Sequence, residues 1–125
     1  MNEAERADAV RSHLCVIAGQ HTPMTYHALA KAVGIDPPHS IHKLSIALER
    51  LMEEDAMAGR PLISSLVISK ARGGLPAPGF FDCARRIGCL DRAASAIEAA
   101  EFYAGEVERA TEYWARRTGQ PTSIE

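Results

Sequence analysis

Three stretches of the chain repeat a hydrophobic residue every three or four positions, which is the spacing of an amphipathic α-helix. In residues 3–18 the apolar face consists of Ala7, Val10, Leu14 and Ile17. In residues 26–33 it consists of Leu29, Ala30 and Val33. In residues 40–58 it consists of Ile41, Leu44, Leu48 and Leu51. The pattern therefore predicts three consecutive helices in the first half of the chain.

Capping and breaking residues separate these helices. Thr25 and Ser40 are expected to cap the second and third helices with their hydroxyl groups. Gly34 and Gly59 follow the last residues of the same helices, where glycine commonly ends a helix. Prolines at 37–38 fix the backbone between the two helices. The second and third helices are thus expected to be joined by a tight, rigid turn.

The periodicity changes after Pro61. The segment LISSLVIS, residues 62–69, is rich in β-branched residues and predicts a strand with alternating faces. A glycine- and proline-rich loop, KARGGLPAPG, follows it and carries Lys70 and Arg72. The segment GFFDCARRIG then predicts a short helix.

A long amphipathic pattern closes the chain. Asp91 is expected to cap a helix that runs to about Arg117, with glutamates over much of its surface. Its apolar stripe consists of Ala96, Ala100, Tyr103, Val107, Ala110 and Trp114. Such a helix spans about 40 Å, and two placements stay open. It packs across the first helix, or it buries its stripe against a second copy of the chain and forms a homodimer.

The order of these elements is that of a winged helix-turn-helix: helix, short helix, tight turn, long helix, strand, basic loop. The sequence thus predicts a mainly α fold with a small β wing and a long C-terminal helix. The winged helix-turn-helix domain is expected over residues 1–90, the C-terminal helix over 91–118 and a flexible tail over 119–125. Basic residues would contact phosphates, and short polar side chains on the third helix would face the bases. The residues expected to bind duplex DNA are Thr25, Tyr26, Ser40, His42, Lys43, Lys70 and Arg72.

Residues 22–79 resemble the DNA-binding domain of the alkylguanine-DNA alkyltransferases and the alkyltransferase-like proteins. The resemblance is carried by MTYHALAKAVG, SIHKLSIAL and PLISSLVISKARGGLPAPGF. It matches Thr25 and Tyr26 to the threonine-tyrosine pair of that family, and it implies that Tyr26 lies beside the phosphate that rotates when a base flips out. His42 falls at or near the arginine with which the family fills the space left by that base.

The chain also departs from this family. His27 stands where the family has glycine, and His42 replaces the arginine, which weakens the expectation of base flipping. After Pro61 the chain has residues 62–65, LISS, where the family has its cysteine, histidine and arginine, so the acceptor thiol is missing. Alkyl transfer needs an activated thiolate. We therefore predict no alkyl transfer, no catalytic residue and no enzyme activity.

Composition indicates a single globular domain that needs no cofactor. The chain has 125 residues, of which 46% are hydrophobic and 24% charged, and its net charge is −2. Residues 61–90 carry four basic residues against one acidic residue, whereas residues 91–125 carry four against seven. A basic middle beside an acidic end is a weak sign of a surface that faces a polyanion.

Cysteine, histidine and apolar segments exclude several classes of protein. Cys15, Cys83 and Cys89 have no disulfide spacing, and the last two are expected to be small buried residues rather than a redox pair. Four of the five histidines lie within residues 21–42, but no zinc motif accompanies them, so we expect no metal. No segment has the length of a membrane span or the pattern of a signal peptide, which predicts a cytoplasmic protein with reduced thiols.

Two functions stay open. The leading one is a non-catalytic protein that binds duplex DNA, as a regulator or a sensor of DNA structure. The alternative is a protein–protein interaction module or an inhibitor in a defence or counter-defence system. The pattern of this chain, including ARGGLPAPGF, also resembles small bacterial proteins, and some related short domains lie beside restriction or other defence functions. The net charge of −2 favours the alternative. DNA binding predicts that Lys43, Lys70 and Arg72 converge on one positive surface, and the alternative predicts an exposed apolar patch.

Overall fold

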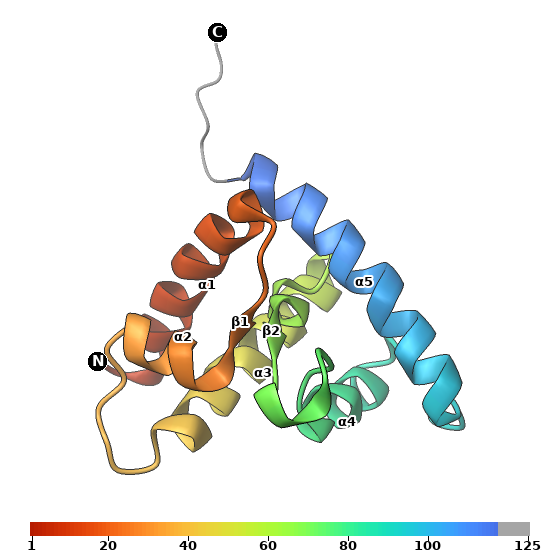
Figure 1. Cartoon of the computed structure of the whole chain (residues 1–125), viewed down its shortest axis with the longest axis horizontal. Coiled ribbons are helices and arrows are strands. Elements are labelled where there is room, and N and C mark those ends of the chain that lie inside the picture. The colour runs from red at the N-terminus through yellow and green to blue at the C-terminus, as the bar shows by residue number, and fades with distance from the viewer. Residues whose placement is uncertain (118–125) are drawn as a thin grey trace, which may run out of the picture.

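The computed structural model describes residues 1–117 and is mainly helical, as the sequence predicts (Figure 1). Residues 118–125, which include the expected tail, lie outside the described residues. The α-helices of the described chain are α1 (Glu3–Gln20), α2 (Tyr26–Ala32), α3 (Ser40–Ala58), α4 (Pro78–Arg86) and α5 (Ala96–Arg116). Two short 3-10 helices, η1 (Ile63–Leu66) and η2 (Lys70–Arg72), and two strands, β1 (Met24–Thr25) and β2 (Val67–Ile68), complete them.

The first three helices confirm the helical periodicity of the sequence. Thr25 caps α2 as expected, because its hydroxyl oxygen accepts a hydrogen bond from the Ala28 N–H at 3.2 Å. The cap predicted at Ser40 is wrong, since Ser40 is the first helical residue of α3. The N-cap is His39, whose backbone is left-handed with φ 62° and whose side chain makes no capping hydrogen bond. The first turn of α3 therefore begins without a side-chain acceptor for its N–H groups.

The helices surround η1. Figure 1 shows α1 and α5 as two sides of a triangle that meet near the end of the described chain, and η1 contacts α1, α3 and α5. One hydrophobic cluster unites α1, α2, α3 and η1 with the second half of α5, and its fully buried members include Val10, Leu14, Leu29, Leu44 and Leu51. A second cluster joins α4 to α5 and contains the edge-to-face ring pairs Phe80–Phe81 and Phe80–Tyr103.

The strand predicted over residues 62–69 is wrong for most of its length. Residues 63–66 form η1, and only Val67 and Ile68 are extended. Ser64 and Ser65 do not alternate between core and solvent, since both are buried. The Ser64 hydroxyl donates to the Leu48 carbonyl at 2.8 Å, and the Ser65 carbonyl accepts from the Tyr103 hydroxyl at 2.8 Å. The Ser64 hydroxyl and the Ser65 carbonyl are thus paired with α3 and α5 rather than with a sheet, whereas the buried Ser65 hydroxyl has no hydrogen-bond partner among the described residues.

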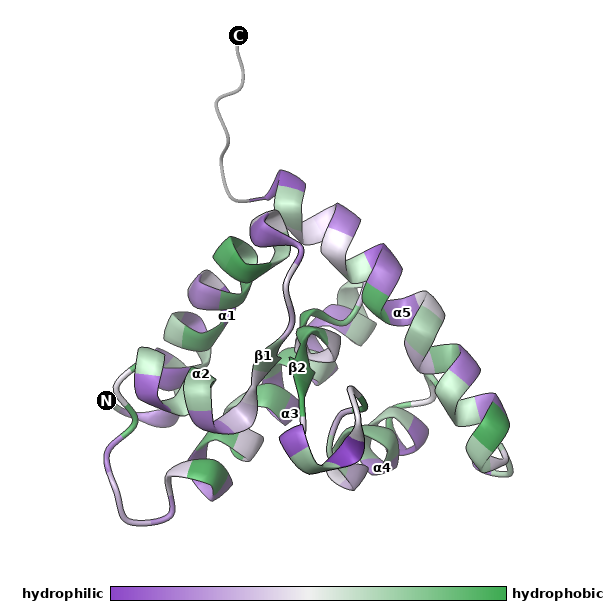
Figure 2. Cartoon of the chain, viewed as in Figure 1, coloured by the Kyte–Doolittle hydropathy of each residue, from purple (hydrophilic) through white to green (hydrophobic). Residues whose placement is uncertain are grey.

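The sheet is a parallel pair in which Met24 lies opposite Val67 and Thr25 opposite Ile68. The described residues contain no antiparallel hairpin, so the loop expected as a β wing is instead the single turn η2 followed by Gly73 and Gly74. Figure 2 shows β2 in the colour of hydrophobic residues and the turn beyond it as hydrophilic.

The C-terminal helix begins later than predicted. Ser95 caps α5 by accepting a hydrogen bond from the Glu98 N–H at 3.1 Å, whereas the Asp91 carboxylate accepts from the Ala93 N–H in a local turn. Of the two open placements, the structure has α5 packed across α1 and η1. Ala110 and Trp114 are buried within the chain, so this part of the stripe needs no second copy to cover it. No helix within residues 1–117 is both long and apolar enough to cross a membrane.

Candidate nucleic-acid interface

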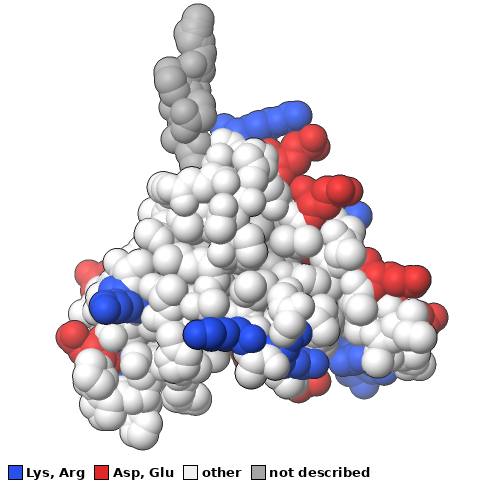
Figure 3. Space-filling model, in the orientation of Figure 1, with Lys and Arg blue, Asp and Glu red and all other residues white. Residues whose placement is uncertain are grey.

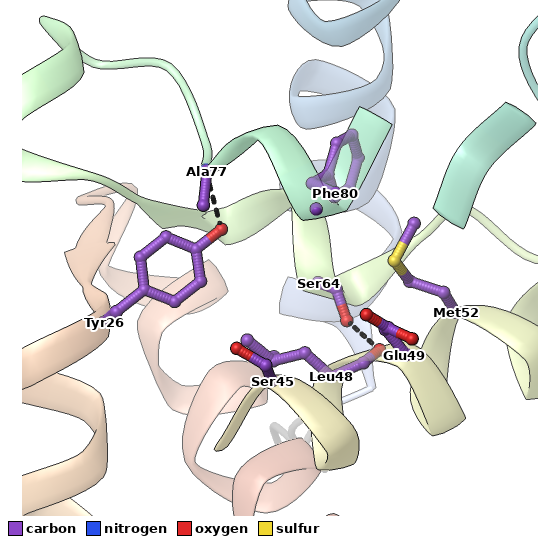
Figure 4. Close-up of a pocket in the computed structure, with 9 residues that line it drawn as sticks. Tyr26, Ser45, Leu48, Glu49, Met52, Ser64, Ala77 and Phe80 are labelled. Carbon is purple, nitrogen blue, oxygen red and sulfur yellow. Dashed lines mark hydrogen bonds between the residues drawn. The ribbon is translucent and has the colours of Figure 1, made fainter. Parts of the chain in front are cut away.

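The β1–β2 pair brings two distant segments of the predicted interface together. Thr25 ends β1 and pairs with Ile68, two residues before Lys70. The residue after Thr25 is Tyr26, and its phenolic oxygen accepts a hydrogen bond from the Ala77 N–H at 2.9 Å (Figure 4). The start of α2 is therefore fastened to both ends of the loop that contains η2.

Tyr26 is a positioning residue for this loop as well as a candidate contact. Burial raises the pKa of Tyr26, while the Ala77 hydrogen bond and the nearby Arg72 charge oppose that rise. Because the hydroxyl only accepts in this hydrogen bond, its own proton is free for a further partner, and the phosphate contact of Tyr26 stays a prediction.

Replacing Tyr26 with phenylalanine tests the positioning role. The Ala77 N–H would lose its partner, and a part-buried N–H left unsatisfied costs about 1–3 kcal/mol. We expect the free energy of unfolding from urea titrations to fall by that amount. Tyr113→Phe is the matched control, because within the described residues the Tyr113 hydroxyl makes no side-chain hydrogen bond while its ring packs on Trp114. Equal stability of the two variants would contradict the tie between α2 and the loop.

The start of α3 presents the second group of predicted residues. His42 is exposed, while Ser40 and Lys43 are half-buried. The Lys43 ammonium donates to the Asp36 carbonyl at 3.1 Å, which holds it over the turn between α2 and α3. The first turn of α3 carries no acidic residue and no side-chain cap, so its N–H groups and helix dipole favour an anion.

Lys70 and Arg72 extend from η2 into solvent. One guanidinium nitrogen of Arg72 donates to the Pro76 carbonyl at 3.3 Å. Figure 1 shows η2 and the start of α3 at the same lower edge of the molecule. The structure thus places Thr25, Tyr26, Lys70 and Arg72 around one loop, and the start of α3 on the same side.

Positive charge is concentrated on this side of the molecule. We call this side the basic face, and it consists of β1, α2, the first turns of α3, and η2. The two chain segments that build it, residues 20–48 and 61–81, contain one acidic residue, Asp36. Against it stand Lys31, Lys43, Lys70 and Arg72, a net charge of +3, whereas the rest of the chain has ten basic and fifteen acidic residues, a net of −5. Figure 3 shows basic side chains across the lower half of this view, with some acidic side chains at its left and lower edges, and mostly acidic side chains along the edge occupied by α5.

Among the described residues, the four cations of the basic face form no ion pair. Within residues 1–117 none of them has a carboxylate oxygen within 4.0 Å, whereas Arg11, Arg60 and Arg86 each have one near 3 Å. Beyond the first turns of α3 most of its charged side chains are acidic. There Glu49 and Glu53 pair with Arg86 on the outer side of the helix. The acidic run Glu53–Asp55 near the end of α3 is only partly exposed, since Asp55 is fully buried.

A small cavity lies behind Tyr26, lined by Ser45, Met52, Ser64 and Phe80 among others (Figure 4). Its volume of about 40 Å³ has room for a few water molecules, given that one needs roughly 10–15 Å³. The Ser64 hydroxyl is engaged by the Leu48 carbonyl, and no histidine lines the cavity. The cavity is therefore too small for a base and presents no activated nucleophile.

The three thiols are not activated either. Burial raises the pKa of Cys83 to about 11 and raises the pKa of Cys15, while partial loss of hydration and the charge of Glu106 raise the pKa of Cys89. Each is therefore a neutral thiol near neutral pH. The expectation that both Cys83 and Cys89 are buried is wrong for Cys89, which is exposed. The described residues contain no group of three or more histidine, cysteine or acidic residues that could hold a metal ion.

Sequence reasoning missed two elements of this interface. Lys31, on the exposed side of α2, is not among the predicted DNA contacts, although its place in a segment with one acidic residue indicates it. The Ala77 N–H could not be foreseen, because its partner lies far away in the sequence. Comparison of the chain with protein-family models, with curated proteins and with solved structures found no match.

Proposed function

We propose that this protein binds duplex DNA through the basic face and catalyses no reaction, serving as a small regulator or as a sensor of DNA structure. The observation that carries the proposal is a set of four cations that have no carboxylate partner within residues 1–117. They lie on two segments, residues 20–48 and 61–81, of net charge +3, in a chain of net charge −2. Phosphates would supply the missing partners, and the release of their counterions would drive binding.

The arrangement of the helices supports a winged-helix-like mode of binding. Residues 33–39 connect α2 to α3, and both helices rest on a core shared with α1. The uncapped first turn of α3 would approach the phosphates or the groove edge, whereas the acidic side that begins at Glu49 would stay outside. The turn η2 would take the place of a wing and contact the backbone through Lys70 and Arg72.

The test is fluorescence anisotropy with a short labelled duplex, titrated over a salt series. Four phosphate contacts would give a slope of log K against log salt of about −3.6. The double variant Lys70→Ala/Arg72→Ala should lower the slope by about 1.8 and weaken binding at low salt by at least about tenfold. Comparing mixed-sequence with lesion-bearing duplexes would separate a regulator from a structure sensor.

A second double variant controls for charge alone. Arg116→Ala/Arg117→Ala also removes two adjacent cations, but at the opposite end of the molecule, where α5 ends. It should leave the salt slope unchanged. The proposal fails if wild type does not bind at low salt, or if the two double variants lose affinity equally.

A further inference from the structure

A groove separates α4 from the first turns of α5. Its volume is about 260 Å³, and its floor is formed by Phe81, Leu75 and Ala99. The groove exists because α5 presents alanines toward α4: Ala96, Ala99 and Ala100 line it with side chains too short to fill the space. Near Tyr103 the rings of Phe80, Phe81 and Tyr103 pack between the two helices and fill the space, so the groove is limited to the start of α5.

Cations dominate the rim of this groove. Arg72 reaches it from η2 and Arg85 from α4, against one acidic residue, Asp82. The Asp82 carboxylate is 3.9 Å from Arg85 and 79% exposed, so this pair contributes little to holding the guanidinium. The other contact of Arg85 is a long hydrogen bond of 3.4 Å to the Ala94 carbonyl. Both guanidiniums therefore have donors left for a carboxylate.

The apolar surface continues beyond the groove on α5. Ile97, in the same first turn as Ala96, is 74% exposed. Figure 2 shows the first turns of α5 mostly in the colours of hydrophobic residues. A single exposed hydrophobic residue is ordinary on a protein surface, so Ile97 adds to the groove only by enlarging the apolar area next to it.

We propose that this groove docks a short acidic and apolar segment of a partner protein. An aliphatic or aromatic side chain would rest on Phe81, and carboxylates on either side of it would pair with Arg72 and Arg85. The volume favours one or two side chains of a peptide, because pockets for whole cofactors or metabolites usually measure about 300–1,000 Å³. The positive rim selects acidic over basic segments, and the apolar floor selects against a nucleic-acid backbone.

The probe is a short labelled peptide that alternates glutamate and leucine, with binding followed by anisotropy. The wild-type protein should bind this peptide. It should bind two control peptides at least about tenfold more weakly: one with serine in place of leucine, and one with lysine in place of glutamate. Arg85→Ala should weaken binding about tenfold, the loss expected for one charge-assisted hydrogen bond. Ala100→Trp should abolish binding because the indole fills the groove. Ala4→Trp, which places the same side chain on the exposed start of α1, should bind like wild type.

Several results would overturn the proposal. Equal binding of the glutamate–serine peptide would mean that the rim charges act without the groove. Unchanged binding by Ala100→Trp would place the peptide elsewhere, and Ala96→Trp at the exposed edge of the groove repeats this test if Ala100→Trp does not fold. Loss of DNA binding rather than peptide binding in Arg85→Ala would assign the groove to the DNA interface. Lys70→Ala should weaken DNA binding alone, so the two proposals can fail separately.

Discussion

Replacing Asp55 with alanine is expected to lower the free energy of unfolding by about 3–5 kcal/mol, the loss typical of removing one member of a buried ion pair. Asp55 has no exposed surface. One carboxylate oxygen lies 2.9 Å from Arg11 and 3.1 Å from Arg60, and the other accepts the Ile63 N–H at 3.0 Å. Alanine would leave two guanidiniums and a buried N–H without this partner.

The position of Asp55 explains why so much depends on it. Helical spacing places it on the face of α3 that already carries Leu44, Leu48 and Leu51. Burial raises the pKa of the Asp55 carboxyl, and the Ile63 N–H and the two arginines oppose that rise, so the ionised form depends on these partners. Through them Asp55 joins α1, the end of α3 and the start of η1. Because β2 follows η1 directly, the same carboxylate fixes the strand that leads to Lys70 and Arg72.

Urea unfolding followed by circular dichroism measures this effect. The matched control is Glu54→Ala, which removes the neighbouring carboxylate. Glu54 also pairs with Arg11, at 3.1 Å, but its side chain is 44% exposed, and pairs of this kind contribute up to about 1 kcal/mol. A loss below about 1 kcal/mol for Asp55→Ala, or equal losses for both variants, would contradict the role assigned to Asp55.

The sequence was a good guide to the helices and a poor one to the segment between α3 and β2. Periodicity located α1 and α3 because each presents one apolar face to a common core. The segment 62–69 has strand composition, yet its first two N–H groups donate to carboxylates of α5 and α3. The Leu62 N–H donates to Glu106 at 2.7 Å, and the Ile63 N–H donates to Asp55. Such pairs depend on tertiary packing, and no local propensity encodes them.

The same limit applies to the candidate sites. The spacing of Lys70 and Arg72 in the sequence predicts that they lie close together. The charge pattern of the chain predicts that they lie away from acidic residues. The contact between Tyr26 and the Ala77 N–H requires the β1–β2 pairing. Strands of two residues are too short for a sequence pattern to predict that pairing. The groove forms where α5 presents three alanines toward α4. Alanines in a sequence indicate a stable helix, but they do not predict a groove beside it. Asp55 could have been found, because it continues the core spacing of α3.

Replacing Trp114 with alanine is the second change with a large expected effect, a loss of about 3–5 kcal/mol in the free energy of unfolding. Trp114 is buried near the end of α5, and its indole N–H donates to the Pro61 carbonyl at 2.9 Å. The guanidinium carbons of Arg11 and Arg60 lie 4.9 Å and 5.6 Å from its ring. Alanine would leave a cavity and would remove the contact between the indole ring on α5 and the guanidinium groups of Arg11 and Arg60. Circular dichroism must report the transition, because the chain has no other tryptophan.

Two further variants separate packing from coupling. Trp114→Phe keeps an aromatic ring over the arginines but loses the hydrogen bond to Pro61, so it should cost clearly less than alanine. Asp55→Ala and Trp114→Ala share Arg11 and Arg60 as partners, and the losses of the double variant should therefore depart from additivity by about 0.5–3 kcal/mol. Tyr26→Phe shares neither arginine and should add to Trp114→Ala within about 0.5 kcal/mol. Additive losses for the first pair would mean that the carboxylate and the indole act on the arginines independently, and that α5 and α3 are joined by packing alone.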